Sequence, residues 1–171
     1  MLRNQKIPAV RLEDKALAAY LDSHLIGSST GVRMFNAAKR TWKGTDAGAD
    51  LARIEQEVAS ERRELKQLMR TLGYRRSLFK AAAARAGAVL GRLNPVNPTR
   101  SGGGATGQLE LELLQSALRG KECLWRTLLE LVQAQPKLDR RRLSELVDTA
   151  RRQQDTVAEI MQRTVPERFI R

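Results

Sequence analysis

The chain has 171 residues, with 42% hydrophobic and 4% aromatic residues and a formal net charge of +12. This size is typical of one domain with a single core, which aliphatic side chains must largely fill. No segment approaches the roughly 20 apolar residues of a membrane-spanning helix, and residues 1–10 lack the apolar run of a signal peptide. The single cysteine, Cys123, excludes an intrachain disulfide, so we expect a cytoplasmic protein.

Residues 1–13 are predicted to form an N-terminal arm, and residues 14–40 the first helix. Apolar residues recur here at spacings of three and four, which places them on one helical face. Gly27 and Gly31 lie inside this helix, although each costs about 1 kcal/mol relative to alanine. We attribute them to a close helix–helix approach or to room for a large neighbour such as Trp125. A break in the helix is the alternative.

The second helix is expected over residues 46–72, with Asp46 or Asp50 as its N-terminal cap and Gly73 as its C-terminal stop. Its inward face is a row of apolar residues with one carboxylate at the centre. The row consists of Leu51, Ile54, Val58, Glu61, Leu65, Leu68 and Leu72.

Residues 73–106 are expected to form a crossover that carries a short helix near residues 76–92. Every charged residue between Glu64 and Glu110 is basic. Three interpretations stay open: the basic segment binds phosphates of nucleic acid without sequence preference, it lies on an anionic membrane surface, or it only keeps an exposed surface soluble. The candidate anion-binding residues are Arg70, Arg75, Arg76, Lys80, Arg85 and Arg92.

The third helix is expected over residues 107–134, and the fourth over residues 139–164 with Asp139 as its cap. Residues 165–171 are expected to be a tail that is frayed or docked by Phe169. Cys123 is expected to flank the core face of the third helix as a small apolar residue, because the only histidine that could activate a thiol lies on another helix.

Short connections join the first helix to the second and the third to the fourth, so each pair should be antiparallel neighbours. The long link 73–106 can run the length of the bundle. We therefore expect an all-α fold, an antiparallel four-helix bundle with one long crossover between helices two and three. Over residues 14–164 this order resembles the ferritin-like superfamily. Segments 20–25 and 120–125 resemble small bacterial proteins of that type, and no characterised activity comes with the resemblance.

Each of the four apolar rows is interrupted near mid-helix by one polar residue. The four residues are His24, Glu61, Lys121 and Gln153. We predict that Glu61 and Lys121 form a buried ion pair, around which His24 and Gln153 complete hydrogen bonds. The alternative is that the Lys121 side chain extends its ammonium group to solvent.

The resemblance to ferritin-like proteins implies a site for two metal ions, with a glutamate on each of two helices and Glu-x-x-His on each of the others. Here Glu57-x-x-Ser60 and Glu61-x-x-Glu64 lack the histidine. We therefore expect no metal and no cofactor, with Lys121 taking the place of the lost cation. The rival hypothesis is an irregular metal site. Its ligands would be Asp22, His24, Glu57 and Glu61.

Three functions are consistent with these patterns. The leading one is a non-catalytic structural or interaction protein on a ferritin-like scaffold, without an intact di-metal site and without catalytic residues. The second is a metal-binding oxidase or iron-storage relative, and the third is a sequence-independent binder of nucleic acid or acidic membranes through the basic crossover. Ferritin-like bundles often pair, so a homodimer stays open. No small-molecule substrate can be inferred.

Overall fold

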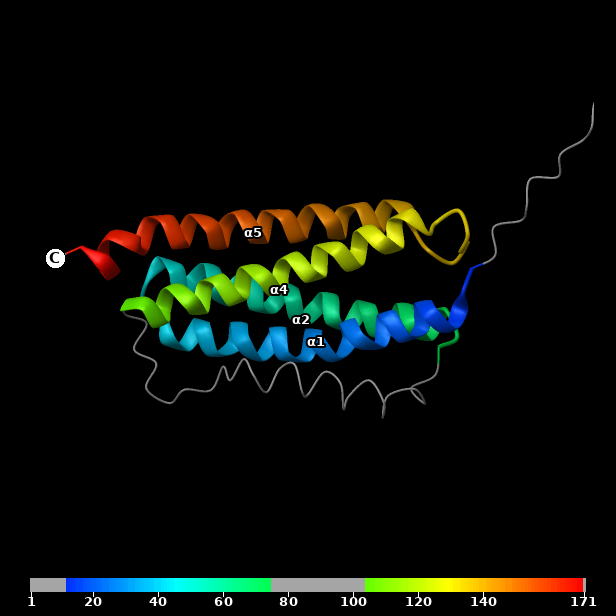
Figure 1. Cartoon of the computed structure of the whole chain (residues 1–171), viewed down its shortest axis with the longest axis horizontal. Coiled ribbons are helices and arrows are strands. Elements are labelled where there is room, and N and C mark those ends of the chain that lie inside the picture. The colour runs from blue at the N-terminus through cyan, green and yellow to red at the C-terminus, as the bar shows by residue number, and fades with distance from the viewer. Residues whose placement is uncertain (1–11, 75–103, 171) are drawn as a thin grey trace, which may run out of the picture.

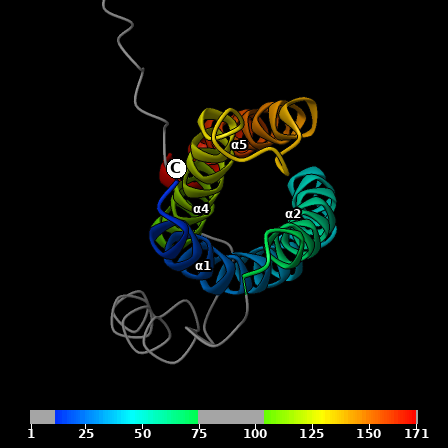
Figure 2. The same ribbon diagram turned by 90° about the vertical axis from the view of Figure 1, so that its right-hand side faces the viewer.

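The computed structural model describes residues 12–74 and 104–170. In this part of the chain the helices are α1 (Asp14–Thr41), α2 (Asp46–Thr71), α4 (Gly104–Glu130) and α5 (Arg140–Phe169). They lie side by side along one long axis (Figure 1), in the ring order α1, α2, α5, α4 when viewed along that axis (Figure 2). This confirms an all-α four-helix bundle. No helix within the described ranges is both long and apolar enough to span a bilayer.

The bundle consists of two closely packed helix pairs. Contacts within the α1–α2 pair and within the α4–α5 pair are far more extensive than the contacts of α1 with α4 or of α2 with α5. The chain turns back between α1 and α2, since Tyr74 at the end of α2 donates a hydrogen bond of 2.9 Å to Asp14 at the start of α1. The two pairs therefore meet along looser seams.

The bounds of α1 and α2 differ by one residue at most from the prediction, and α1 is continuous through Gly27 and Gly31. The predicted caps of α2 are wrong. Thr45 caps this helix, because its extended backbone places the side-chain oxygen where it accepts the Gly48 N–H at 3.1 Å.

The end of α2 follows the prediction. Gly73 has a φ of 84°, a left-handed conformation that glycine adopts without steric cost. The Gly73 N–H donates to Arg70 O and the Tyr74 N–H donates to Met69 O, both at 3.0 Å. These two bonds form the glycine-terminated cap that satisfies the last carbonyl groups of a helix.

The predicted end of α4 at residue 134 is wrong, because the helix stops at Glu130 and residues 131–134 form a turn. The Ala134 N–H donates to Leu131 O at 3.0 Å, a tighter spacing than in an α-helix. Pro136 follows, and a proline disfavours helical backbone at the residue before it. The helix also begins earlier than predicted, at Gly104.

The prediction for Asp139 is confirmed, since its carboxylate accepts the Arg142 N–H at 3.1 Å. α5 extends beyond the predicted end at 164, through Pro166 to Phe169. Arg168 holds this last turn in place, because its guanidinium lies 5.5 Å from the centroid of the Trp42 ring and donates to Met161 O at 3.1 Å. Docking by Phe169 is wrong, as that side chain is 56% exposed.

The predicted apolar rows face the interior. Two apolar clusters fill the bundle, one toward each end. The inward row predicted for the fourth helix is buried throughout, and consists of Leu143, Leu146, Ala150, Gln153, Val157, Ile160 and Thr164. On α2 and α4 the polar residues Glu61 and Lys121 each separate members of one cluster from members of the other. The bundle therefore has a polar layer between two apolar halves. The arm 1–11, most of the crossover 73–106 and its expected helix near 76–92 lie outside the described residues.

Candidate functional site

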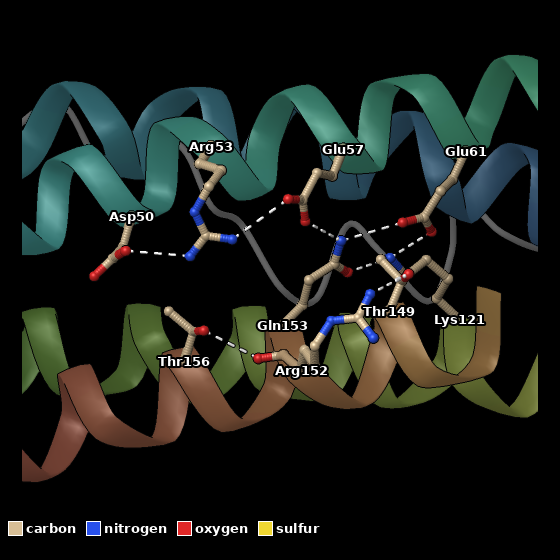
Figure 3. A network of polar contacts seen from close by, with 9 residues as sticks. All are labelled: Asp50, Arg53, Glu57, Glu61, Lys121, Thr149, Arg152, Gln153 and Thr156. Carbon is tan, nitrogen blue, oxygen red and sulfur yellow. Dashed lines mark hydrogen bonds and ion pairs between the residues drawn. The ribbon is translucent and has the colours of Figure 1, made fainter. Parts of the chain in front are cut away.

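Glu61 of α2, Lys121 of α4 and Gln153 of α5 meet at the centre of the bundle (Figure 3). Lys121 Nζ lies 2.5 Å from Glu61 Oε2 and donates a hydrogen bond to Gln153 Oε1. The exposed fraction of the side chain is 13% for Lys121 and 5% for Glu61. The predicted buried ion pair is confirmed, and the alternative in which the ammonium extends to solvent is wrong.

The Gln153 amide connects this pair to a second carboxylate. Its Nε2 donates to Glu61 Oε1 at 3.1 Å and to Glu57 Oε2 at 2.7 Å. Glu57 in turn accepts from Arg53 at 3.3 Å, and Arg53 donates to Asp50 at 3.2 Å. Figure 3 shows this polar row along the face of α2 that is turned toward α5.

The sequence analysis missed this extension along α2. The spacings from Asp50 to Arg53 and from Arg53 to Glu57 are three and four residues, which are helix-face spacings. They could have predicted the polar row, because they repeat next to the apolar face of the same helix.

Burial and the neighbouring carboxylates act in opposite directions on the pKa of Lys121. Burial lowers the pKa of the Lys121 ammonium from its usual value, while the charges of Glu61 and, more weakly, Glu57 act in the opposite direction. The carboxylates thus oppose the effect of desolvation on the ammonium. Removing Glu61 alone would leave that ammonium without its closest counter-charge.

His24 does not take part in this layer. No hydrogen bond joins it to Glu61, Lys121 or Gln153, all of which are in the described structure, and its ring instead packs edge-on against Tyr20 with the centroids 4.6 Å apart. Burial lowers the pKa of His24, which favours the neutral imidazole. The prediction that His24 completes hydrogen bonds around the pair is therefore wrong.

The irregular metal site proposed from the sequence does not assemble here. No three His, Cys, Asp or Glu side chains within residues 12–74 and 104–170 are grouped as a metal ion would need, and Asp22, His24, Glu57 and Glu61 all lie in these ranges. Asp22 is 2% exposed, and burial raises the pKa of its carboxyl group. The described residues do not fit the di-metal centre of ferritin-like proteins, because the Glu61 carboxylate is already paired with the Lys121 ammonium.

A cavity of about 450 Å³ lies beside the ion pair, between α1, α2 and α4. Three helical glycines line it: Gly27 and Gly31 of α1 and Gly120 of α4. A Cβ atom added at any of the three would meet no atom of another described segment within 4 Å. Close helix–helix approach is therefore wrong as the explanation of the α1 glycines. Trp125 lines the same cavity, but no atom of it lies within 4 Å of a Cβ at Gly27 or Gly31.

A second buried carboxylate, Glu122, lies outside the predicted layer. It is 2% exposed and accepts hydrogen bonds from Arg119 at 2.6 Å, Arg151 at 3.1 Å and Gln154 at 2.9 Å. These contacts lower the pKa of Glu122 to about 2, the Gln154 hydrogen bond contributing most. Glu122 therefore links α4 to α5 by charge, and Arg119, three residues earlier on the same helix, was the available sequence signal.

The remaining candidates from the sequence are placed as follows. Arg70 is exposed on α2, whereas the other anion-binding candidates lie outside the described residues. These are Arg75, Arg76, Lys80, Arg85 and Arg92. Cys123 is exposed, and its expected place beside the core is wrong because two residues past Lys121 correspond to about 200° around the helix.

No protein-family model, curated protein or solved structure matches this chain.

Proposed function

We propose that this protein is a non-catalytic binding or structural protein, built as an antiparallel bundle of the ferritin-like type in which an ion pair has replaced a di-metal site. The contact between Lys121 Nζ and Glu61 Oε2 at 2.5 Å is the observation that supports this proposal. A lysine ammonium supplies the positive charge that metal ions would otherwise bring to the inward carboxylates of such a bundle.

The pair contributes more to specificity than to stability. Replacing a buried ion pair by apolar residues of similar volume is often neutral or stabilising, whereas removing one partner typically costs about 3–5 kcal/mol. Glu61, Lys121 and Gln153 come from three different helices, so their bonds form only in one axial register. The proposed role of the layer is to fix that register.

A double-mutant cycle tests the pairing. We expect Lys121→Met and Glu61→Leu each to lower the free energy of unfolding by about 3–5 kcal/mol, and the double variant to recover much of the loss. Urea denaturation followed by circular dichroism at 222 nm measures all four proteins. A double variant as unstable as the sum of the two single variants would refute the coupling.

Elemental analysis of protein purified without chelator tests the absence of the di-metal function. We expect iron and manganese far below one equivalent per chain. Either metal near stoichiometric amount, lost in a Glu61→Gln variant that stays folded, would instead establish the metal-binding alternative and overturn the proposal.

Sequence-independent anion binding is a second candidate, supported by the run of charge from Lys66 to Arg100, in which every charged residue is basic. Binding through phosphates loses affinity steeply between about 50 and 200 mM salt, by roughly 10³-fold or more for six contacts. A gel-shift series with duplex DNA and co-sedimentation with acidic vesicles across this range test it. No complex with either at low salt removes this candidate.

A further inference from the structure

The cavity between α1, α2 and α4 has the size of a ligand site. Its volume of about 450 Å³ lies within the range of roughly 300–1,000 Å³ that small-molecule pockets occupy. Its lining residues extend from Ser23 to Phe35 on α1 and from Leu113 to Trp125 on α4, about 18 Å on each helix at 1.5 Å per residue. A cavity of this volume and length is narrow. Its shape therefore suits a ligand with an unbranched chain better than a ligand built from rings.

The chain keeps this volume open at a cost to its stability. Gly27, Gly31 and Gly120 lie in helix interiors, where each glycine is about 1 kcal/mol less favourable than alanine. No described segment outside their own helices lies within 4 Å of a Cβ at these positions, so packing does not require glycine there. Protein interiors are otherwise close-packed. A cavity preserved against both tendencies indicates a use for the space.

The walls are largely apolar, although small polar side chains such as Ser28, Thr30 and Ser116 also line them. Aliphatic and aromatic side chains of three helices line most of the surface, among them Phe35, Val58, Leu65, Leu118 and Leu124. Glu61, Lys121 and Trp125 line the same cavity. Lys121 and Trp125 are four residues apart on α4 and so are neighbours on one helical face. A ligand with an apolar tail and one polar head would match this division.

Two hydrogen-bond donors near the ion pair are available to a ligand. The Trp125 indole is 1% exposed, and its Nε1 has no hydrogen-bond partner among the described residues. Lys121 uses two of its three N–H bonds on Glu61 and Gln153, which leaves one for another acceptor. Both oxygens of Glu61 are already in contact with Lys121 or Gln153. An orphaned buried donor costs about 1–3 kcal/mol, so the missing group is an acceptor.

We propose that this cavity binds a medium-length aliphatic carboxylate, whose head accepts from Lys121 Nζ and Trp125 Nε1 while its alkyl chain lies along Gly27, Gly31 and Gly120. A carboxylate has two oxygens and accepts from both donors at once. Charge-assisted hydrogen bonds of this kind are roughly twice as strong as neutral ones. The inference rests on the ion pair of the proposed function for its head group and on the glycine-lined wall for its tail.

Isothermal titration calorimetry with the full chain tests this inference, using decanoate, decanol and decylamine below their aggregation limits. We expect decanoate to bind with one site per chain and at least about tenfold more tightly than decanol, because the charged head accepts stronger, charge-assisted hydrogen bonds from the two donors. Equal affinity of decanol, or tighter binding of decylamine, would overturn the carboxylate assignment. No binding of any of the three would overturn the site.

A cavity-filling variant locates the binding. Gly31→Leu places a side chain into the cavity, and we expect it to weaken decanoate binding at least about tenfold. Ala19→Leu makes a similar addition at an exposed position of the same helix and should leave binding unchanged. Equal binding by the wild type and a folded Gly31→Leu variant would overturn the location.

A direct reporter covers the case in which Gly31→Leu does not fold. Trp42 and Trp125 are the two tryptophans of the chain, so in a Trp42→Phe variant Trp125 is the sole source of tryptophan fluorescence. Decanoate should shift its emission with the same midpoint as the calorimetric titration, and an unchanged spectrum at saturation would overturn the proposed head-group contact. Stoichiometric metal in the purified protein would count against the proposed function alone, whereas loss of the head-group preference would count only against this inference.

Discussion

Replacement of Gly31 by alanine is expected to stabilise the protein, even though this residue is buried in α1. A buried glycine in a packed core normally leaves no room for a methyl group. Here a Cβ at Gly31 would meet no other described segment within 4 Å, so the helix propensity of alanine acts without a steric penalty. We expect the free energy of unfolding to rise by about 1 kcal/mol and the melting temperature by about 2–4 °C.

Gly48 provides the matched control, since it is also a buried helical glycine. A Cβ there would lie 2.1 Å from Trp42 O and 2.8 Å from Trp42 C, both backbone atoms. The backbone must move, and overpacking of this kind costs about 1–3 kcal/mol. Gly48→Ala should therefore be destabilising. Urea denaturation and thermal melts of the wild type and both variants give the comparison, and a Gly31→Ala variant as unstable as Gly48→Ala would refute the cavity.

Three further predictions concern the caps and charges. Thr45→Ala should lower the free energy of unfolding by about 1 kcal/mol in urea denaturation while Thr45→Ser retains it, because the hydroxyl accepts the Gly48 N–H; equal losses would exclude the cap. Glu122→Gln should lower the free energy of unfolding by about 1–2 kcal/mol near neutral pH. The loss is this small because the paired arginines are more than half exposed. The folded pKa of Glu122, about 2, lies below its ordinary value of 4.5, so this contribution is complete above the ordinary value and lost as the pH falls toward the folded one. Wild type and Glu122→Gln should therefore converge in acid melts, and a constant difference would contradict the assignment. Burial lowers the pKa of His24 below 6.5, so the unfolded chain takes up the proton first and the wild type loses stability as the pH falls through and below 6.5. His24→Gln should lose less in melts over that range, and parallel losses would contradict the burial of the imidazole.

The sequence predicted the features that depend on periodicity. The four helices and their buried faces follow from apolar spacings of three and four residues, and the Glu61–Lys121 pair followed because both residues lie on those faces. The capping of α5 by Asp139 and the end of α2 at Gly73 are local in the same sense, since each depends on a few neighbouring residues.

The features that depend on contacts distant in sequence were not predicted. Arg168 stabilises the last turn of α5 because its guanidinium packs on Trp42, which is more than a hundred residues earlier in the sequence. Glu122 is buried because Arg151 of α5 approaches it, although its position on α4 is off the inward row. The position of His24 was also wrong, because its ring packs against Tyr20, four residues earlier on the same helix, instead of against the polar layer.

The error at His24 explains the geometry of the site. Three helices supply the polar layer, through Glu61, Lys121 and Gln153, and α1 supplies no partner for it. The glycine-lined part of α1 borders the cavity instead, so the layer has three protein sides and an open fourth one.

Because the polar layer has an open side toward α1, substitutions at Gly31 affect both the free energy of unfolding and the proposed ligand binding. Polar α1 side chains such as His24 and Ser28 line the same cavity, yet the Trp125 indole has no hydrogen-bond partner among the described residues. Gly31 leaves space in the cavity that both donors, Trp125 and Lys121, line, and it lowers helix stability at the same residue. If the cavity binds a ligand, a larger side chain at Gly31 should therefore favour folding but oppose binding. Gly31→Ala raises the free energy of unfolding, and Gly31→Leu weakens the binding of decanoate. Stabilisation by alanine with undiminished decanoate binding by leucine would show that the space exists but that the carboxylate binds elsewhere.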